Sequence, residues 1–181
     1  ETCNGKRFKK EILEVTFEGK NIDDILKMTI DEALEFFSTH KQNKIVQKIQ
    51  PLQDVGLGYV QLGQSSSTLS GGEAQRIKLA SFLVKGTIKD NALFVFDEPT
   101  TGLHFHDIKK LLKSFDALIE KGHSIIVIEH NLDLIKCADY ILDIGPEGGE
   151  NGGKLMAFGT PEEVAKNKNS VTGKYLKEKL N

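Results

Sequence analysis

The sequence predicts an α/β fold in which a mostly helical first half precedes a core built on parallel β-strands. The core is indicated by two apolar runs, 93–97 and 124–128, which flank an amphipathic segment at 105–120. The apolar stripe of this segment consists of Phe105, Ile108, Leu111, Leu112, Phe115 and Ile119. Such a pattern is typical of two parallel strands joined by a helix in a right-handed crossover, with the strands buried. A chain of 181 residues suffices for one domain, or for two small subdomains, with a hydrophobic core.

Helix-capping signals organise the first half of the chain. An alternating apolar run over 13–17 predicts a short strand. Asn21 is suited to cap a helix, and Thr29 with Glu32 forms the pattern of a capping box before another helix. A further helix is expected over 45–52, although Pro51 leaves its end open. We therefore expect this half to be a mostly helical arm.

The last quarter of the chain predicts two more strands, 140–144 and 154–158, and a capped helix that begins at Thr160. The glycine-rich run 148–154 fits the first seven places of the phosphate-loop pattern G-x-x-x-x-G-K-[ST]. Its eighth place is Leu155, and a strand follows where the motif requires a helix. We therefore predict a glycine-rich hairpin here and no phosphate loop in this chain.

The block Ser70, Gly71 and Gly72 predicts a helix N-terminus that is able to bind an anion. A serine and two glycines leave backbone N–H groups and the positive end of the helix dipole free to face an anion. Ser70 with Glu73 three residues later also forms a capping box, so simple helix capping is an equally good explanation of the block alone. The apolar face expected for this helix consists of Ala74, Ile77, Ala80 and Val84.

Polar residues follow both strands of the predicted βαβ unit. Asp97 and Glu98 end the first strand, and His130 comes directly after the second. Ligands bind at the carboxyl ends of strands in open α/β sheets, where one carboxylate can hold Mg²⁺ and another can act on water. A pair of acidic residues after a strand is by itself equally typical of a polar turn. The order of these elements and the Ser-Gly-Gly block favours nucleotide hydrolysis.

Charge and cysteine content narrow the possible partners. The net charge of −2 gives no general basic surface, and only the cluster around Lys6 and Arg7 is locally basic. A solvated charge run is the commoner explanation of such a cluster. No stretch approaches the length of a membrane span and no secretory signal is visible, so we expect a cytoplasmic protein without a membrane partner. Cys137 is expected to be a buried small residue, and Cys3 alone cannot form a tetrahedral zinc site.

The motifs resemble those of a known family. The blocks 69–73 and 93–100 resemble the signature and Walker B motifs of ABC-type ATPases, and residues 100–104 with His130 resemble the loop and switch histidine that follow them. More specifically, the chain resembles the C-terminal part of the UvrA family, the damage-recognition ATPases of the bacterial excinuclease. This resemblance covers essentially the whole chain and rests on the runs 2–8, 55–64, 100–105, 129–133 and 143–149.

The resemblance implies a division of the chain and a role for each motif. Residues 1–10 would end a zinc module, 11–88 would form the helical signature subdomain, and 89–181 the C-terminal half of an ABC nucleotide-binding core. Asp97 would hold Mg²⁺, Glu98 would activate water, and His130 would contact the γ-phosphate. The anion-facing residues Ser70, Gly71 and Gly72 would contact the ATP of an opposing domain. Cys3 would be the fourth ligand of a zinc site, and Lys6 and Arg7 would approach DNA phosphates.

The resemblance also implies partners. The parent protein would be a homodimeric ATPase of nucleotide excision repair and the SOS response that binds damaged double-stranded DNA and loads UvrB. Because this chain has no phosphate loop, we expect it to be a segment of a longer protein and to lack ATPase activity by itself. Two alternatives are an ABC ATPase of another class, such as the motor subunit of a transporter, and a non-catalytic interaction module.

Overall fold

The computed structural model describes residues 7–85, 91–149 and 152–180, with the side chain of residue 85 left aside. The chain forms two compact units, Glu1–Val127 and Ile128–Asn181. In chain order, the elements are α1 (Lys10–Leu13), α2 (Ile22–Lys27), α3 (Ile30–Thr39), α4 (Asn43–Asp54), the 3₁₀ turn Ser66–Thr68, α5 (Gly71–Lys85), β1 (Leu93–Asp97), α6 (Phe105–Ile119), β2 (Ser124–Ile128), α7 (Leu132–Ile135), β3 (Ile141–Gly145), β4 (Lys154–Gly159), α8 (Pro161–Lys166) and α9 (Val171–Lys179).

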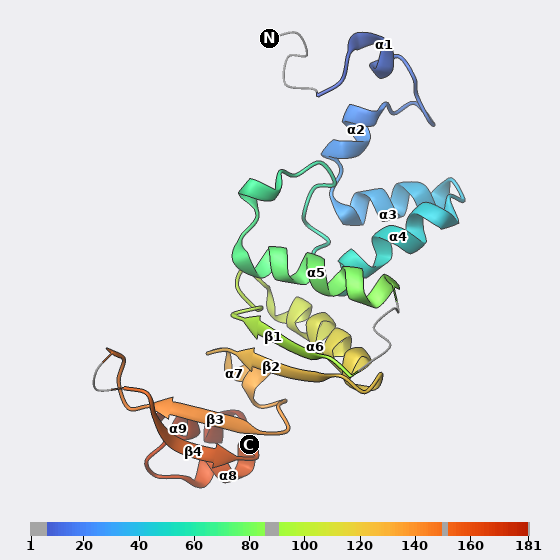
Figure 1. The fold of residues 1–181 in the computed structure, drawn as a ribbon. Coiled ribbons are helices and arrows are strands. Elements are labelled where there is room, and N and C mark those ends of the chain that lie inside the picture. The colour runs from blue at the N-terminus through green and yellow to red at the C-terminus, as the bar shows by residue number, and fades with distance from the viewer. Residues whose placement is uncertain (1–6, 86–90, 150–151, 181) are drawn as a thin grey trace. The chain divides into compact units, whose positions relative to one another are not determined.

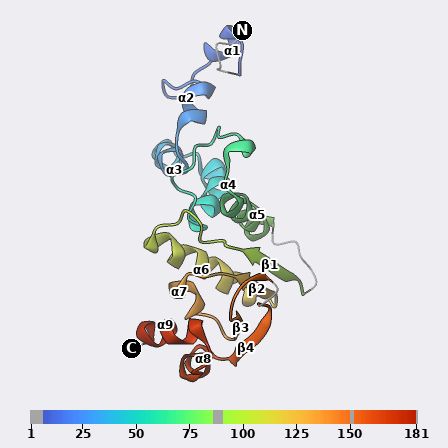
Figure 2. The same ribbon diagram turned by 90° about the vertical axis from the view of Figure 1, so that its left-hand side faces the viewer.

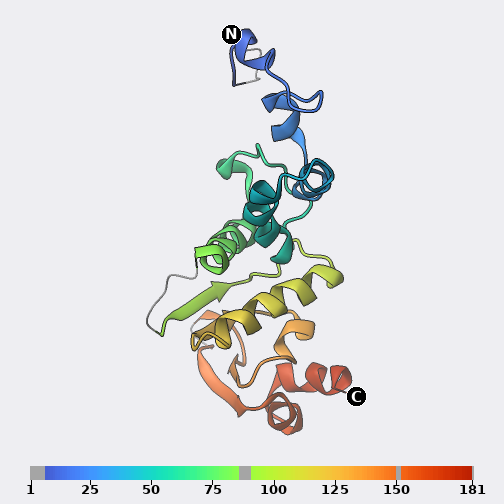
Figure 3. The ribbon, with the colours of Figure 1, turned by 90° about the vertical axis from the view of Figure 1, so that its right-hand side faces the viewer.

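The capping signals of the helical arm act as the sequence predicts. The Asn21 side chain accepts hydrogen bonds from two backbone N–H groups at the start of α2. At α3, the N–H of Glu32 donates to Thr29 Oγ1 over 3.2 Å, and the N–H of Thr29 donates to Glu32 Oε2 over 2.8 Å. This capping box fixes the start of α3, whose buried face packs against α4 (Figure 3). That buried face consists of Ile30, Ala33, Leu34 and Phe37.

The strand predicted over 13–17 is wrong. Residues Lys10–Leu13 are helical, and Val15 is exposed. Phe17 and Lys20 exchange two backbone hydrogen bonds across a turn in which Glu18 and Gly19 have positive φ angles of 49° and 76°. An alternating run needs a second strand to pair with, and within the described residues none pairs with 13–17. The segment therefore ends in a tight turn instead of entering a sheet.

β1, α6 and β2 form the expected βαβ unit. β1 and β2 are neighbours in a two-stranded sheet and run in the same direction, with α6 beside them (Figure 1). The two strands are not buried as predicted, because Leu93 and Val95 are 60% and 59% exposed and Ile126 is also exposed. Nothing in the described part of this unit covers that face of the sheet. The sequence correctly predicts the strands but not their exposure, since a nearly continuous apolar run signals burial on both faces.

The buried stripe of α6 is rotated from the predicted one. Ile108, Leu111 and Phe115 are buried as expected, whereas Phe105 and Ile119 are almost half exposed. Their places are taken by Ser114 and Leu118. Ser114 is buried because its hydroxyl donates to the backbone carbonyl of Asp54, at the end of α4, over 3.2 Å. A hydroxyl with such a partner can face the core, which apolar periodicity alone does not reveal.

The second unit is an antiparallel hairpin with two helices packed on it (Figure 2). β3 and β4 pair antiparallel with Leu142 opposite Phe158, which confirms the predicted hairpin, and the described part of the run 148–154 leads into β4. The predicted capped helix is α8, and its cap is a capping box in which Thr160 and Glu163 bond reciprocally. The core of this unit consists of Ile141, Ala157, Val164 and Leu176, with Leu132, Ile135 and Ala138 packed against it.

Cys137 is exposed, so the prediction of a buried cysteine is wrong. It lies just after α7, and its thiol donates to the backbone carbonyl of Asp133 over 3.4 Å. α7 has only four residues and ends before Cys137, so the apolar neighbours of Cys137 in sequence are a poor guide to its burial.

The carboxylate of Asp143 anchors α9 to β3, and its removal should loosen that helix. Asp143 accepts hydrogen bonds from the hydroxyls of Ser170 and Thr172, and Ser170 Oγ in turn caps α9 by accepting from the N–H of Gly173. Asp143→Asn should destabilise this unit by about 1–3 kcal/mol, because an amide presents only one acceptor atom to two hydroxyls. Hydrogen-exchange mass spectrometry of 171–180 should show faster exchange in the variant.

The matched control is Asp139→Asn, at an exposed aspartate just before β3. It should leave the exchange of 171–180 unchanged. Equal exchange rates in Asp143→Asn and the wild type would contradict the anchoring role.

Candidate functional site

The Ser-Gly-Gly block starts α5 with a capping box. The N–H of Glu73 donates to Ser70 Oγ over 3.2 Å, and the N–H of Ser70 donates to Glu73 Oε2 over 2.7 Å. The N–H groups of Gly71 and Gly72 have no hydrogen-bond acceptor among the described residues. Capping and anion binding are therefore compatible, because the box uses one N–H of the helix and leaves the first two available.

The two glycines of the block have different surroundings. A Cβ added at Gly71 would meet nothing within 4 Å. A Cβ added at Gly72 would lie 3.2 Å from Arg76 Nη1 and 3.3 Å from the carbonyl oxygen of Glu98. Gly72 thus lets the first turn of α5 approach the loop after β1, whereas the exposed Gly71 leaves the helix end open to an incoming group.

Arg76 joins α5 to the loop after β1. Its side chain is completely buried, and Nη1 donates to the carbonyl oxygen of Pro99 over 2.6 Å and to that of Thr101 over 3.3 Å. Nη2 donates to the hydroxyl of Tyr59 over 3.3 Å, and that hydroxyl donates to Glu73 Oε1 over 2.7 Å. A continuous network therefore runs from the cap of α5 through Tyr59 and Arg76 to the loop.

Electrostatics in this network follow burial and hydrogen bonding. The hydrogen bond from the backbone of Ser70, supported by that from Tyr59, lowers the pKa of Glu73. Burial, supported by the bond to Glu73, raises the pKa of Tyr59. Burial also lowers the pKa of Arg76, against the opposing effect of Tyr59 and Glu73. The ordinary pKa of arginine lies far above neutrality, so the guanidinium stays charged at neutral pH. The lowered pKa keeps Glu73 ionised there as well.

Gln75 fixes the last residue of β1. Its Nε2 donates to the carbonyl oxygen of Asp97 over 3.1 Å, and its Oε1 accepts from the N–H of Asp97 over 3.1 Å. The amide thus pairs with both main-chain groups of Asp97, as a neighbouring strand would. The side chain of Asp97 is not needed for this contact, and the residue is exposed at the strand end.

Glu98 has an unusual backbone conformation. Its φ angle is +46°, in the left-handed region that residues with a side chain enter at a cost of about 1–3 kcal/mol. The turn that follows is closed by a hydrogen bond from the N–H of Thr101 to the carbonyl of Glu98 over 3.1 Å. Pro99 is buried while Glu98 is exposed, so the strained residue is held between two well-fixed neighbours.

The structure brings most of the predicted site residues of the first unit together. Gly72 lies against Glu98, Asp97 is bonded to α5, and Ser70 and Gly71 form the start of that helix. The face predicted for α5 is confirmed only at Ala80, however. Its buried residues are Gly72, Arg76, Leu79 and Ala80, whereas Ala74 and Val84 are exposed.

His130 belongs to the second unit, in the short segment between β2 and α7. It is exposed, and its N–H donates to Glu129 Oε2 over 2.8 Å. The same carboxylate oxygen accepts from the N–H of Asn131, whose side chain caps α7. The carboxylate of Glu129 therefore shapes the turn that carries His130.

Other predicted sites lie partly outside the described residues. Cys3 and Lys6 are outside them, and Arg7 is exposed with a φ angle of +61°. Within the described residues, 7–85, 91–149 and 152–180, no group of three or more metal-ligating side chains occurs. In the same ranges, no helix is long and apolar enough to cross a membrane.

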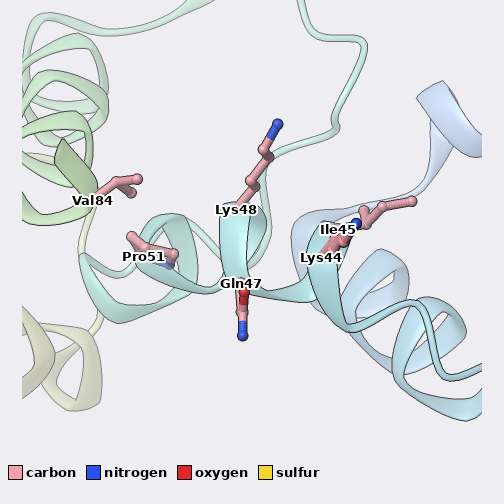
Figure 4. A pocket seen from close by; sticks show the side chains of 6 residues that line it. All are labelled: Lys44, Ile45, Gln47, Lys48, Pro51 and Val84. Atoms are coloured by element: carbon pink, nitrogen blue, oxygen red, sulfur yellow. The ribbon is translucent and has the colours of Figure 1, made fainter.

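A surface groove of about 520 Å³ lies between α4 and the end of α5 (Figure 4). None of the predicted site residues lines it. Its lining residues are Lys44, Ile45, Gln47, Lys48, Pro51 and Val84.

Sequence reasoning missed Gln75, Arg76 and Tyr59, which organise this site. A signal was present, because Gln75 and Arg76 follow the Ser-Gly-Gly block within a single helical turn and polar residues there fall on the same side as Gly72. Their partners are main-chain groups of 97–101, however, and main-chain partners leave no trace in the sequence.

Together, these features define a class of protein. The βαβ unit, the carboxylate-bearing loop and the helical subdomain whose Ser-Gly-Gly helix packs on that loop form part of an ABC-type nucleotide-binding domain. A scan against protein-family models found no match.

Comparison with individual proteins shows which members of this class the chain resembles. The chain is 59% identical over 180 residues to UvrABC system protein A of Aquifex aeolicus, and 58% identical over 180 residues to that of Clostridium perfringens. These alignments cover 99% of this chain but only 19% of each relative. The crystal structure of UvrA2 from Deinococcus radiodurans matches 98% of this chain and 21% of its own, with a TM-score of 0.81 and 45% identity. The resemblance to the UvrA family is thereby confirmed for nearly the whole chain.

The α5 cap should weaken in acid. Because the folded state lowers the pKa of Glu73, its stabilising effect is complete above the unfolded value of about 4.5 and is lost as pH falls through the folded pKa. The free energy of unfolding of Glu73→Gln should therefore fall less than that of the wild type between about pH 5 and pH 3.

Denaturant titrations at a series of pH values measure this difference. Glu35→Gln, which changes an exposed carboxylate on α3, is the control and should follow the wild-type curve. Parallel curves for Glu73→Gln and the wild type would contradict the assigned role of Glu73.

Proposed function

We propose that this chain is the C-terminal segment of a UvrA-type ATPase of bacterial nucleotide excision repair, which hydrolyses ATP, recognises damaged double-stranded DNA and loads UvrB. The observation that carries the ATPase proposal is the packing of the Ser-Gly-Gly helix directly on the loop of Asp97 and Glu98. The named relatives, UvrABC system protein A, support the repair assignment. The division into 1–10, 11–88 and 89–181 is part of this proposal.

The residues present suit the chemistry. The carboxylate of Asp97 is exposed at a strand end and would hold Mg²⁺, which would neutralise phosphate charge. Glu98 would accept the proton of the attacking water, and His130 would contact the γ-phosphate. Ser70 and the open N–H groups of Gly71 and Gly72 would bind the phosphates of an ATP held by an opposing domain.

The exposed apolar face of β1 and β2 supports a larger nucleotide-binding core. Apolar side chains on both faces are typical of sheets with a layer on each side. The relatives are several times longer than this chain, and the phosphate loop would lie in their additional length. The chain by itself is therefore expected to release no phosphate from ATP. We also propose that the parent protein is a cytoplasmic homodimer, that Cys3 completes a zinc site, and that Lys6 and Arg7 contact DNA.

Glu98→Gln in the full-length protein tests the ATPase proposal. Loss of the base should lower kcat by about a hundredfold or more while ATP affinity stays nearly unchanged, because the carboxamide keeps the shape but accepts no proton. Steady-state phosphate release and equilibrium binding of a fluorescent ATP analogue measure the two quantities. Near-normal turnover would refute the role of Glu98.

DNA binding by the full-length protein tests the repair proposal separately. Duplexes of one sequence, with and without a single bulky lesion, should differ in both affinity and the effect on ATP turnover. Equal behaviour of the two duplexes would favour the alternative of another class of ABC ATPase, such as a transporter motor. That outcome would leave the ATPase proposal intact.

A further inference from the structure

The main chain on both sides of Glu98 is held by two side chains of one helix. Gln75 pairs with the N–H and the carbonyl of Asp97, the residue before Glu98. Arg76 donates to the carbonyls of Pro99 and Thr101, which follow it. Glu98 itself has a positive φ angle, which among the described non-glycine residues it shares with Arg7, Glu18 and Lys41.

These contacts are suited to maintain a strained conformation. Left-handed φ angles at residues with side chains persist where the surroundings over-determine them. The Asp97 main chain is held by two bonds of 3.1 Å, and the bond from Arg76 to Pro99 measures 2.6 Å. Arg76 is completely buried and its Nε has no hydrogen-bond partner in the described part of the chain, so its position is set by the carbonyls and by Tyr59.

The helix that carries both residues also begins with the Ser-Gly-Gly block. Gln75 and Arg76 lie within the first two turns of α5, and a Cβ added at Gly72 would lie 3.3 Å from the carbonyl oxygen of Glu98. The first turns of α5 and the loop therefore form one packed piece. A group that binds at the open N-terminus of α5 acts on the same rigid element that orients Glu98.

We propose that Gln75 and Arg76 are positioning residues that hold Glu98 in its catalytic orientation and couple nucleotide contact at the start of α5 to water activation after β1. This inference rests on the proposed ATPase function. It adds that the block Ser70–Gly72 serves one ATP while its own helix controls the carboxylate that acts on another.

The test uses Gln75→Glu and two variants of Arg76 in the full-length protein. Gln75→Glu replaces the donor to the Asp97 carbonyl with an oxygen that repels it, at nearly constant size. Arg76→Met removes all donors, and Arg76→Lys keeps the charge and part of the donor set. We expect kcat to fall about tenfold or more in Gln75→Glu and Arg76→Met, with KM for ATP within about twofold of the wild type, and an intermediate kcat in Arg76→Lys.

The matched control is Gln47→Glu, the same chemical change at an exposed residue of α4, which should leave kcat and KM unchanged. Hydrogen exchange of 71–84 reports whether α5 remains folded; a Gln75→Glu variant with intact α5 and wild-type kcat would overturn the inference. So would a loss of activity confined to KM, or a loss of kcat that simply follows unfolding of α5. If Glu98→Gln retained turnover, the proposed function would fail instead, which keeps the two failures distinguishable.

Discussion

The buried guanidinium of Arg76 determines how the first unit is organised. A charged group taken out of water must find several partners, and the partners of Arg76 are two main-chain carbonyls of 99–101 and the hydroxyl of Tyr59. Hydrogen bonds to a charged group contribute about 1.5–3 kcal/mol each, and here they offset the cost of removing the guanidinium from water. It fixes the rotation of the helix and brings Gly72 against Glu98.

The network of Arg76 also connects the two roles of the Ser-Gly-Gly block, helix capping and anion binding. Glu73 closes the capping box with Ser70 and also accepts from Tyr59, which contacts Arg76. Helix capping therefore belongs to the network that orients the loop, while the N–H groups of Gly71 and Gly72 remain available. One feature of the sequence serves local stability and the proposed contact with phosphate because different backbone groups carry the two roles.

The apolar side chains exposed on the sheets complement this polar network. In the first unit they lie on β1 and β2, and in the second unit on the outer face of the β3–β4 hairpin, where Leu142 and Phe158 face each other. Exposed apolar area of this kind is typical of surfaces that another part of a protein covers. The lengths of the UvrA relatives agree with such a cover in the proposed parent protein.

The sequence by itself predicted the strands at 93–97, 124–128, 140–144 and 154–158, the helix caps at Thr29, Ser70 and Thr160, and the resemblance to the UvrA family. Each of these depends on neighbouring residues or on ordered motifs, which a single sequence displays. Tertiary structure alone decided which side of α5 is buried, that Ser114 faces inward, and that Gln75 and Arg76 hold the loop around Glu98. The physical reason is that these outcomes depend on main-chain partners far away in the sequence, and a carbonyl carries no residue-specific signal.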